Sequence, residues 1–442
     1  MNRRQLLISI LLTAIFFCQC NKEPGPEPTF PDDHFVKALI RTGVDKNKDQ
    51  IISPDEAEPI TILSVDGDSI SDLTGIEFFT NLRSLTCSGN QLTQADFSNN
   101  KALEYLDCSH NQIRSLITSN PELEQLICNS NLLSKVDISN NPGLKYFNCQ
   151  SNRLTGLDIS NNTSLVSLRC DGNRITALNI SVRNGINEII CNGNSLTTLD
   201  MSNCPDLKKL DASGNPLTAI DVTKNTSLTY LDCNGAYFNI LNISNNTLLK
   251  YLNCNNNHNL TSLDLSNNLV LETIECASTD LTSLDISKNA FLKELICAGD
   301  KLTSLDVSDN PALTCLNCGQ NNLTTLDVSK NLELEGLNCE YNPLGSIDVS
   351  KNIKLKSLSC RKNELSNLDV SKNVNLKQLA CSTNPISKLD LTLNNQLELL
   401  WIESMSDLTK VCVWVMPFPP AGFELRTTYS LKVIFTTDCT DL

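Results

Sequence analysis

Residues 103–113 read Leu-Glu-Tyr-Leu-Asp-Cys-Ser-His-Asn-Gln-Ile, and this frame, Leu-x-x-Leu-x-Cys-x-x-Asn-x-(Leu/Ile), returns along most of the 442-residue chain. Its cysteine recurs about every 21 residues, and Ala212 fills the one vacancy in the series. A fixed period of this length indicates supersecondary units stacked in a row, because each unit is too small to bury a core alone. The cysteines of the series are Cys87, Cys108, Cys128, Cys149, Cys170, Cys191, Cys233, Cys254, Cys276, Cys297, Cys318, Cys339, Cys360 and Cys381.

Each repeat contains two extended halves. The first holds the cysteine, and the second reads Leu-Thr-x-Leu-Asp-Val-Ser-x-Asn, as in residues 302–310. Two extended halves leave no room for a helix within one repeat. Alternate residues of a strand face opposite ways, so the leucines and the cysteine point inward together. We therefore predict a β-rich solenoid over residues 60–400, with a parallel β-ladder on its concave face, short extended segments on its convex face and little helix.

The nested pattern resembles the leucine-rich repeat, in the 21-residue bacterial form that carries Cys in place of the third Leu. The resemblance covers about three quarters of the chain and implies a fold that is placed in the α/β class by convention. It also implies a recognition module that binds a protein or glycan on the concave face of the solenoid. Two alternatives stay open: a structural stalk or coat component with no specific ligand, and an accessory protein of glycan processing.

Polar residues also recur once per repeat. The Asn of the frame is expected to bond turn backbone groups that lack ladder partners. In the second half, Asp followed two places later by Ser or Thr is expected to cap turn N–H groups. Stacked Ca²⁺ sites of the RTX type are the alternative for this column, but the paired glycines of that motif are missing. We expect the series of thiols to be buried and reduced, because Cys behaves as a small hydrophobe where it replaces Leu.

The residues on either side of the frame's second Leu face outward on the concave side, where solenoids bind. Four of the seven tyrosines fall in one of these outward columns. Tyr is enriched at interfaces because it gives contact area at low entropy cost, although Tyr also simply suits strands. We predict a ligand-binding surface that contains Tyr105, Asp107, Tyr146, Tyr230, Asp232, Tyr251 and Asn253.

Charge and motif content exclude other function classes. The net charge is −15, and phosphate backbones attract the opposite sign, so we expect no nucleic-acid partner. The three histidines, His34, His110 and His258, fall in parts of the sequence that the repeats keep far apart. The sequence has no motif with the spacing typical of a catalytic nucleophile, a phosphate-binding loop or a zinc site. We therefore expect a binding protein, not an enzyme, and a monomer.

Residues 1–20 have the features of a signal peptide, with Arg3-Arg4, an apolar core and Cys18-Gln19-Cys20. The ending resembles a bacterial lipoprotein signal, which implies that Cys20 is acylated and that the lipid anchor is the chain's membrane contact. Residues 21–31 form a Pro-rich tether, and its start resembles the export tag of Bacteroidetes surface lipoproteins. The resemblance implies a surface-exposed, lipid-anchored protein of the outer membrane; an ordinary secretory signal is the alternative.

Residues 32–59 are predicted to form a helical N-terminal cap. Within them, residues 45–56 resemble an EF-hand loop, which implies one Ca²⁺ held by Asp45, Asn47, Asp49, the Ile51 carbonyl and Glu56. Gln50 departs from the pattern at the place of the usual Gly, so a vestigial loop that serves only as the cap is the alternative.

Residues 401–442 are predicted to form a C-terminal cap of β-strands, because the repeat fades after Trp401 while Val411–Val415 and Leu431–Phe435 have strand composition. Such a cap would close the apolar end of the solenoid. Cys412 and Cys439 are candidates for a disulfide there, although the sequence does not decide whether they are bridged.

Overall fold

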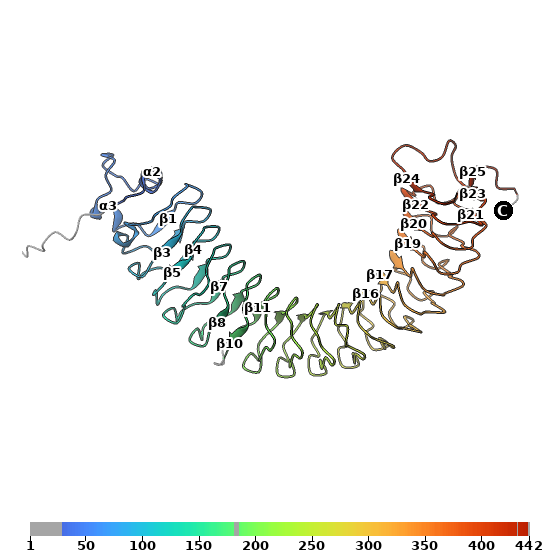
Figure 1. The fold of residues 1–442 in the computed structure, drawn as a ribbon, viewed down its shortest axis with the longest axis horizontal. Helices are drawn as coiled ribbons and strands as arrows, with labels where there is room; N and C mark the ends of the chain where they lie inside the picture. Colours follow the sequence, from blue (N-terminus) through green and yellow to red (C-terminus); the bar gives the residue numbers. More distant parts are fainter. Residues whose placement is uncertain (1–28, 181–184, 431, 441–442) are drawn as a thin grey trace, which may run out of the picture.

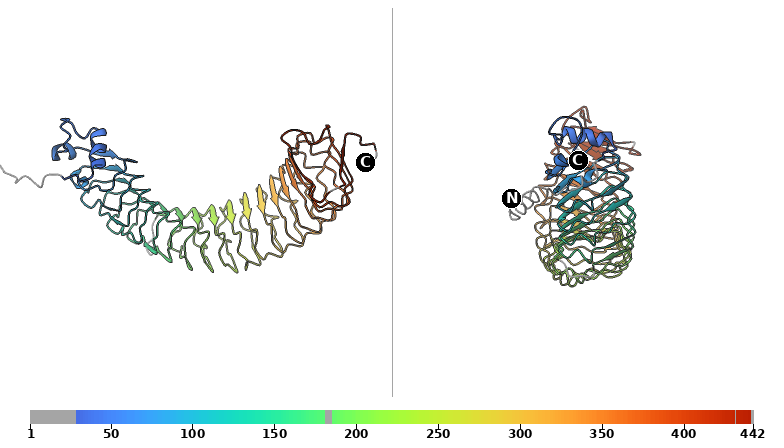
Figure 2. Two further views of the ribbon diagram at one scale, coloured as in Figure 1. Left: turned by 45° about the horizontal axis from the view of Figure 1, so that its top comes forward. Right: turned by 90° about the vertical axis from the view of Figure 1, so that its left-hand side faces the viewer.

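The computed structural model describes residues 29–180, 185–430 and 432–440. These residues form one curved solenoid, with the N-terminal helices at one end of the arc and the C-terminal strands at the other (Figure 1). The two additional views show coils stacked side by side along the arc (Figure 2). The β-rich leucine-rich repeat architecture that the period predicted is therefore confirmed.

An 18-stranded parallel sheet lines the inside of the arc. Each strand has three residues and pairs with the equivalent residues of the next coil, as Leu231 pairs with Leu210 and Leu252. The strands, in order along the sheet, are β1 (Ile62–Ser64), β2 (Ser84–Thr86), β4 (Tyr105–Asp107), β6 (Gln125–Ile127), β7 (Tyr146–Asn148), β9 (Ser167–Arg169), β11 (Glu188–Ile190), β12 (Lys209–Asp211), β13 (Tyr230–Asp232), β14 (Tyr251–Asn253), β15 (Thr273–Glu275), β16 (Glu294–Ile296), β17 (Cys315–Asn317), β18 (Gly336–Asn338), β19 (Ser357–Ser359), β20 (Gln378–Ala380), β22 (Leu399–Trp401) and β24 (Glu424–Arg426).

The second halves of the repeats lie on the convex side as short extended segments. Some of them pair as strands: β3 (Gln94–Asp96) with β5 (Ser115–Ile117), β8 (Gly156–Asp158) with β10 (Ala177–Asn179), and β21 (Lys388–Asp390), β23 (Lys410–Cys412) and β25 (Ile434–Thr436) in a row. The Asp column caps its turns as expected; Asp306, for example, accepts a hydrogen bond of 2.9 Å from the Ser308 N–H. Hydrogen bonding from the Ser308 hydroxyl, together with this N–H contact, holds the pKa of the Asp306 carboxyl below its usual value.

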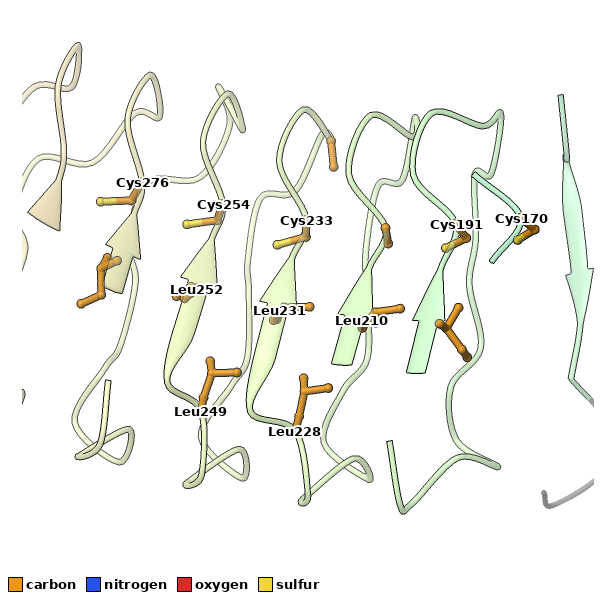
Figure 3. Close-up of a cluster of buried hydrophobic side chains, with 14 of the residues drawn as sticks. Cys170, Cys191, Leu210, Leu228, Leu231, Cys233, Leu249, Leu252, Cys254 and Cys276 are labelled. Atoms are coloured by element: carbon orange, nitrogen blue, oxygen red, sulfur yellow. The ribbon is translucent and has the colours of Figure 1, made fainter. Parts of the chain in front are cut away.

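The core is a continuous stack of leucines and thiols between the two sides (Figure 3). Every cysteine of the series is fully buried and reduced, as predicted. Burial raises the pKa of these thiols, to about 12 for Cys128, so they are held in the neutral form. Coils above and below cover each coil's apolar side chains, and such burial is worth about 1.5–3 kcal/mol for each fully covered side chain.

Two buried asparagine columns fix the turns at both edges of the sheet. In the predicted column, Asn111 donates to the carbonyls of Cys87 and Cys108, while its own oxygen accepts from the Leu92 N–H at 3.0 Å. A second column, whose role the sequence did not suggest, ends the second half of most repeats; Asn268, for example, donates to the carbonyls of Ile243 and Asn246. Stacked amides thereby satisfy turn carbonyls that no strand could reach.

Each end of the stack is covered. At the N-terminus, α2 (Asp33–Arg41) buries Phe35 and Leu39, the 3₁₀ helix η1 spans Ile76–Phe78, and α3 (Pro54–Ala57) closes the EF-hand-like loop. None of the helices in the part of the chain that the structure describes is long and apolar enough to cross a membrane.

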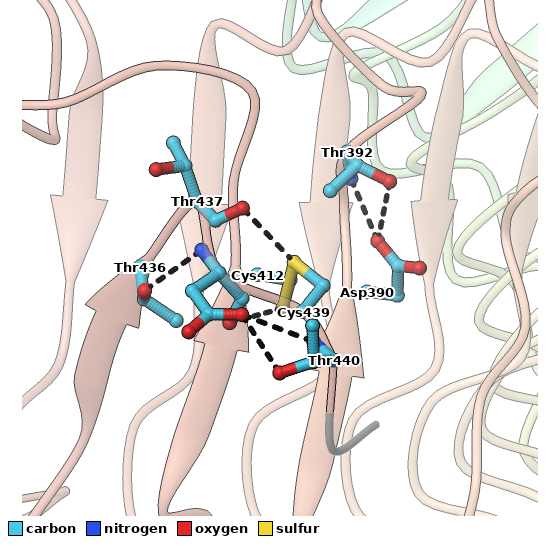
Figure 4. Close-up of a disulfide and its surroundings, with 8 residues drawn as sticks. Asp390, Thr392, Cys412, Thr436, Thr437, Cys439 and Thr440 are labelled. Atoms are coloured by element: carbon cyan, nitrogen blue, oxygen red, sulfur yellow. Dashed lines mark hydrogen bonds between the residues drawn. A yellow bond between two sulfur atoms is a disulfide. The ribbon is translucent and has the colours of Figure 1, made fainter.

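The C-terminal end continues the solenoid past residue 400, where the sequence pattern fades. β22 and β24 extend the concave sheet, and β23 and β25 extend the convex one. A disulfide joins Cys412 of β23 to Cys439 just beyond β25 (Figure 4). The last coils are therefore modified repeats, tied together covalently, that serve as the cap.

Candidate recognition surface

Tyr230 and Tyr251 occupy facing positions on β13 and β14. Their rings stack with centroids 4.4 Å apart and planes 4° apart. On one side of the pair, the Lys209 ammonium lies 5.2 Å from the centroid of the Tyr230 ring. On the other, the Tyr251 hydroxyl donates a 2.9 Å hydrogen bond to Glu275 of β15. Four neighbouring strands thus fix one aromatic pair in a single arrangement.

Acids and amides of the second outward column surround this pair. Asp232 accepts hydrogen bonds from the Asn253 side chain at 3.3 Å and from the Asn234 N–H at 3.1 Å. Asn253 was predicted to be a ligand contact, but its side chain is buried, and its oxygen accepts from the Asn255 N–H. Asn253 is therefore placed to support Asp232, which is half-buried at the surface, as Tyr251 is. We call Tyr230, Asp232, Tyr251 and Glu275 the tyrosine patch.

The tyrosine patch holds concentrated negative charge. Burial, with the charges of Asp211 and Glu275 adding to it, raises the pKa of the Asp232 carboxyl to about 6. Burial and the hydrogen bond to Glu275 raise the pKa of the Tyr251 hydroxyl. The charges of Asp211 and Glu275 act unfavourably on the Asp232 carboxylate, and a nearby cation would offset this repulsion. The patch is therefore chemically suited to a basic group.

The predicted N-terminal group is more dispersed. Tyr105 and Asp107 lie on β4 and Tyr146 on β7, with β6 and its Gln125 between them. Tyr146 is 48% exposed and borders a shallow hollow of about 250 Å³ on the concave face. Ile127, Asn148 and Arg169 also line this hollow. Tyr146 lies on the same concave face as Tyr105, but one strand separates the two residues, so they do not form a compact patch.

The EF-hand-like loop is closed by hydrogen bonds to its own backbone. Glu56 accepts from the N–H groups of Lys46, Asn47 and Ser53 and from the Ser53 hydroxyl, which together hold the pKa of the Glu56 carboxyl down to about 2. Asp45 accepts from the N–H of Lys48 and of Gln50.

Gln50 adopts the left-handed conformation, with φ of 68°, that Gly usually takes at this place of the loop. The carboxylates are thus engaged by amides, and among the described residues no group of three or more His, Cys, Asp or Glu is arranged to hold a metal ion. This arrangement fits the capping role without a metal, and Ca²⁺ binding stays a prediction.

Proteins of similar sequence and structure show which family this chain belongs to. No family model matches it. The structure of the functional domain of InlJ from Listeria monocytogenes, which includes a cysteine ladder, superposes with a TM-score of 0.75 at 33% identity, over 87% of this chain and 80% of that one. A leucine-rich repeat protein of Leptospira interrogans superposes with a TM-score of 0.69 at 21% identity, over 79% of this chain and 94% of that one, and supports the fold alone.

The full-length Internalin J of Listeria monocytogenes is 37% identical over 71 residues, which are 16% of this chain and 8% of that protein. The chain thus matches a small part of that longer protein. Leucine-rich repeat proteins are in general modules that bind other proteins on the surfaces their stacked coils form. The chain belongs to the leucine-rich repeat proteins with a cysteine ladder, the family represented by the functional domain of InlJ.

Proposed function

We propose that this chain is a recognition module, anchored at the cell surface, that binds a protein partner on its concave face at the tyrosine patch. The observation that carries the proposal is the stack of Tyr230 on Tyr251 between Lys209 and Glu275. A side chain already held in one arrangement loses little entropy on binding, and tyrosines are frequent hot spots for that reason.

The chemistry of the patch favours a partner that presents lysine or arginine. Asp232 and Glu275 provide carboxylates, and the tyrosine rings provide faces and edges for the aliphatic stems of such residues. A partly buried carboxylate pairs more strongly with a cation than an exposed one does, because water screens it less. A glycan would instead use the hydroxyl and amide groups of the same surface and would depend little on the acids.

Cell-surface anchoring rests on Cys20 and the apolar segment before it, which lie outside the described residues. We propose acylation of Cys20 and an outer-membrane location, with the solenoid carried away from the bilayer by residues 21–31. Replacement of Cys20 by Ala should release the protein from membranes in a fractionation experiment. A variant that stays in the membrane fraction would remove the lipid-anchor part of the proposal and leave the concave-face part intact.

The binding proposal is tested by cross-linking and pull-down from the natural surroundings with the full chain, followed by measurement of the recovered protein's affinity. The wild type should retain a partner that the variant with Tyr230→Ala and Tyr251→Ala does not. Binding that survives this change, or the complete lack of a saturable protein or glycan ligand, would favour the stalk or coat component.

A further inference from the structure

Two basic side chains near the C-terminal end of the concave sheet lack a close acidic partner. Arg361 and Lys362 follow β19, at the edge where the chain leaves the strand (Figure 1). Among the described residues, the one carboxylate within ion-pair distance of Arg361 is Glu340, at 4.0 Å, and Lys362 has none. The Arg361 side chain is only 28% exposed, so water screens its charge less than that of a surface cation.

Aromatic rings hold these two cations in place. The Cζ atom of Arg361 lies 5.9 Å from the ring centroids of both Tyr341 and Trp401, which come from the coils of β18 and β22. The Lys362 ammonium lies 5.3 Å from the Tyr341 centroid. A guanidinium that lies against ring faces keeps the N–H groups of its own plane available as donors. We call Tyr341, Arg361, Lys362 and Trp401 the basic cluster.

Two donors of the basic cluster have no acceptor. The Nε of Arg361 and the Nε1 of Trp401 are buried, and neither makes a hydrogen bond within the part of the chain that the structure describes. Arg426 also lies against the Trp401 ring, at 4.3 Å, but its Nε already donates to Glu424 at 2.8 Å. Buried donors are seldom left unpaired, and a carboxylate beside Arg361 would supply an acceptor that the fold does not.

The backbone at Tyr341 and Lys362 is strained for side chains of this size. Their φ angles are 55° and 50°, and the equivalent residue of every coil also has a positive φ. Glycine holds this position in seven coils, as Gly67, Gly89, Gly172, Gly193, Gly214, Gly235 and Gly299. The left-handed region disfavours residues with a Cβ, and strain of this kind is typical of ligand-binding sites. Two large side chains are therefore held here, in consecutive coils, against the preference of the backbone.

The charge of the surrounding coils suits an acidic ligand. Residues 351–388 contain eight Lys and Arg against two Asp and Glu, whereas the whole chain has a net charge of −15. On the concave side of this segment, Lys356 and Lys377 already pair with glutamates, at 2.7 and 2.9 Å. Arg361 and Lys362 are the concave cations that this leaves for a ligand. A carboxylate is therefore repelled along most of the arc and least at these coils.

We propose that the basic cluster binds a carboxylate, presented by an acidic segment of the protein partner. Arg361 and Lys362 provide the charge, and Tyr341 and Trp401 provide the apolar contact for the stem of an aspartate or glutamate. The assignment to the same partner rests on the proposed function. The coil of β19 lies five strand spacings, or about 24 Å, from Tyr251 on β14. A partner that reaches both sites presents a basic group to the tyrosine patch and an acidic group to the basic cluster.

Titration of the full-length chain with hexaglutamate, an acidic peptide with blocked ends, tests the site without the natural partner. Trp401, one of the two tryptophans of the chain, lies beside Arg361, so its fluorescence reports on the site. We expect a saturable change in emission at low ionic strength, which added salt should weaken. Hexalysine, a probe of the opposite charge, should leave the emission unchanged.

Three variants show whether the basic cluster makes the contact. Arg361→Gln with Lys362→Gln should raise the dissociation constant for hexaglutamate at least about fivefold. The matched control is Arg83→Gln with Lys145→Gln, which changes two cations beside the concave strands that already pair with glutamates, at 2.8 and 2.6 Å. This control should bind hexaglutamate as the wild type does. Tyr341→Gly relaxes the backbone, so it should keep or raise the melting temperature while it weakens binding.

The lack of a saturable response to hexaglutamate would overturn the inference, and so would equal weakening in the control variant. Unchanged binding with a lower melting temperature in Tyr341→Gly would show that the basic cluster only ties neighbouring coils together. Tighter binding of a galacturonate oligosaccharide than of hexaglutamate, lost in Arg361→Gln with Lys362→Gln, would assign the site to an acidic glycan instead. None of these results needs the natural partner, so a failure of the basic cluster is distinguishable from a failure of the tyrosine patch.

Discussion

Asp300 accepts hydrogen bonds of 2.7 Å from both the N–H and the hydroxyl of Thr279, one coil before it. These two residues replace asparagines of the first buried column. In the neighbouring coils, the amide of Asn321 instead donates to the carbonyls of Cys297 and Cys318. Asp300 has no amide to donate, and its second carboxyl oxygen is buried without a partner among the described residues. Burial raises the pKa of Asp300 to about 6.

Asp300→Asn should therefore stabilise the fold. An acid whose folded pKa lies above its unfolded value of about 3.9 destabilises the protein increasingly as pH rises from 4 to 6, and the loss is complete above 6. The variant should gain about 1–2 kcal/mol in the free energy of unfolding at pH 7–8, and little near pH 4. Chemical denaturation at both pH values measures the difference. Asp306→Asn removes a carboxylate that caps a turn and should not stabilise; a gain there equal to that at Asp300 would contradict this account.

Loss of both aromatic rings of the tyrosine patch should abolish most of the recognition. Tyr230→Ala with Tyr251→Ala should weaken binding by about 2 kcal/mol or more, because stacked tyrosines at the centre of a surface are typical hot spots. The rings are half-buried against each other, so the free energy of unfolding should also fall, by about 1 kcal/mol. Calorimetric titration and thermal melts separate the two effects.

The matched control for the aromatic pair is Asp306→Ala with Asp327→Ala on the convex side, which should bind as the wild type does. Tyr251→Phe keeps the stack and removes the hydrogen bond to Glu275. It should therefore lose less affinity than the double alanine variant. Equal loss in both variants would show that the hydroxyl, and not the aromatic pair, provides the contact.

Affinity for a basic partner should depend on pH through Asp232. Its carboxyl has a pKa of about 6 in the free protein, so it is mostly charged at pH 7.5 and mostly neutral at pH 5. A basic ligand favours the charged form, and affinity should therefore fall by several-fold as pH drops through 6. In Asp232→Asn this step should disappear, with the affinity at pH 7.5 lowered to near the acidic value. A glycan ligand should show neither the step nor the loss.

The positions that determine the fold were readable because each has the same role in every coil. Leu231 and Cys233 face the core in the same way as Leu210 and Ala212 one coil earlier, so the period revealed them. The outward Tyr column followed from the same alternation. The hydrogen bond from Tyr251 to Glu275 could not be predicted from this alternation, because it joins different columns on different coils and depends on side-chain rotamers.

The C-terminal repeats were hidden from the sequence pattern for an identifiable reason. The frame's cysteine becomes Ile402 in the coil of β22, and the loop leading to β24 is longer, so the terminal repeats lost their period while they kept their pairing.

The final prediction concerns the EF-hand-like loop. Glu56 accepts three backbone and one hydroxyl hydrogen bond, and it joins residues 46–47 to the start of α3. Glu56→Ala leaves these donors without their shared acceptor, so the N-terminal cap should open at a lower temperature even with a chelator present. The pKa of Glu56 is lowered to about 2, so its contribution is complete above the unfolded value of about 4.3 and is lost as pH falls towards 2.

Hydrogen exchange of residues 33–57 reports this loss directly, and Glu58→Ala, an exposed neighbour without these contacts, is the control. The variant should exchange faster than the wild type at pH 7, and the two should converge at low pH. Titration with Ca²⁺ then decides the loop's second role. One bound ion in the wild type and none in Asp45→Ala with Glu56→Ala would establish a metal site in addition to the cap. A wild type that gives no signal, together with faster exchange in Glu56→Ala, would show that Glu56 stabilises the loop but does not bind Ca²⁺.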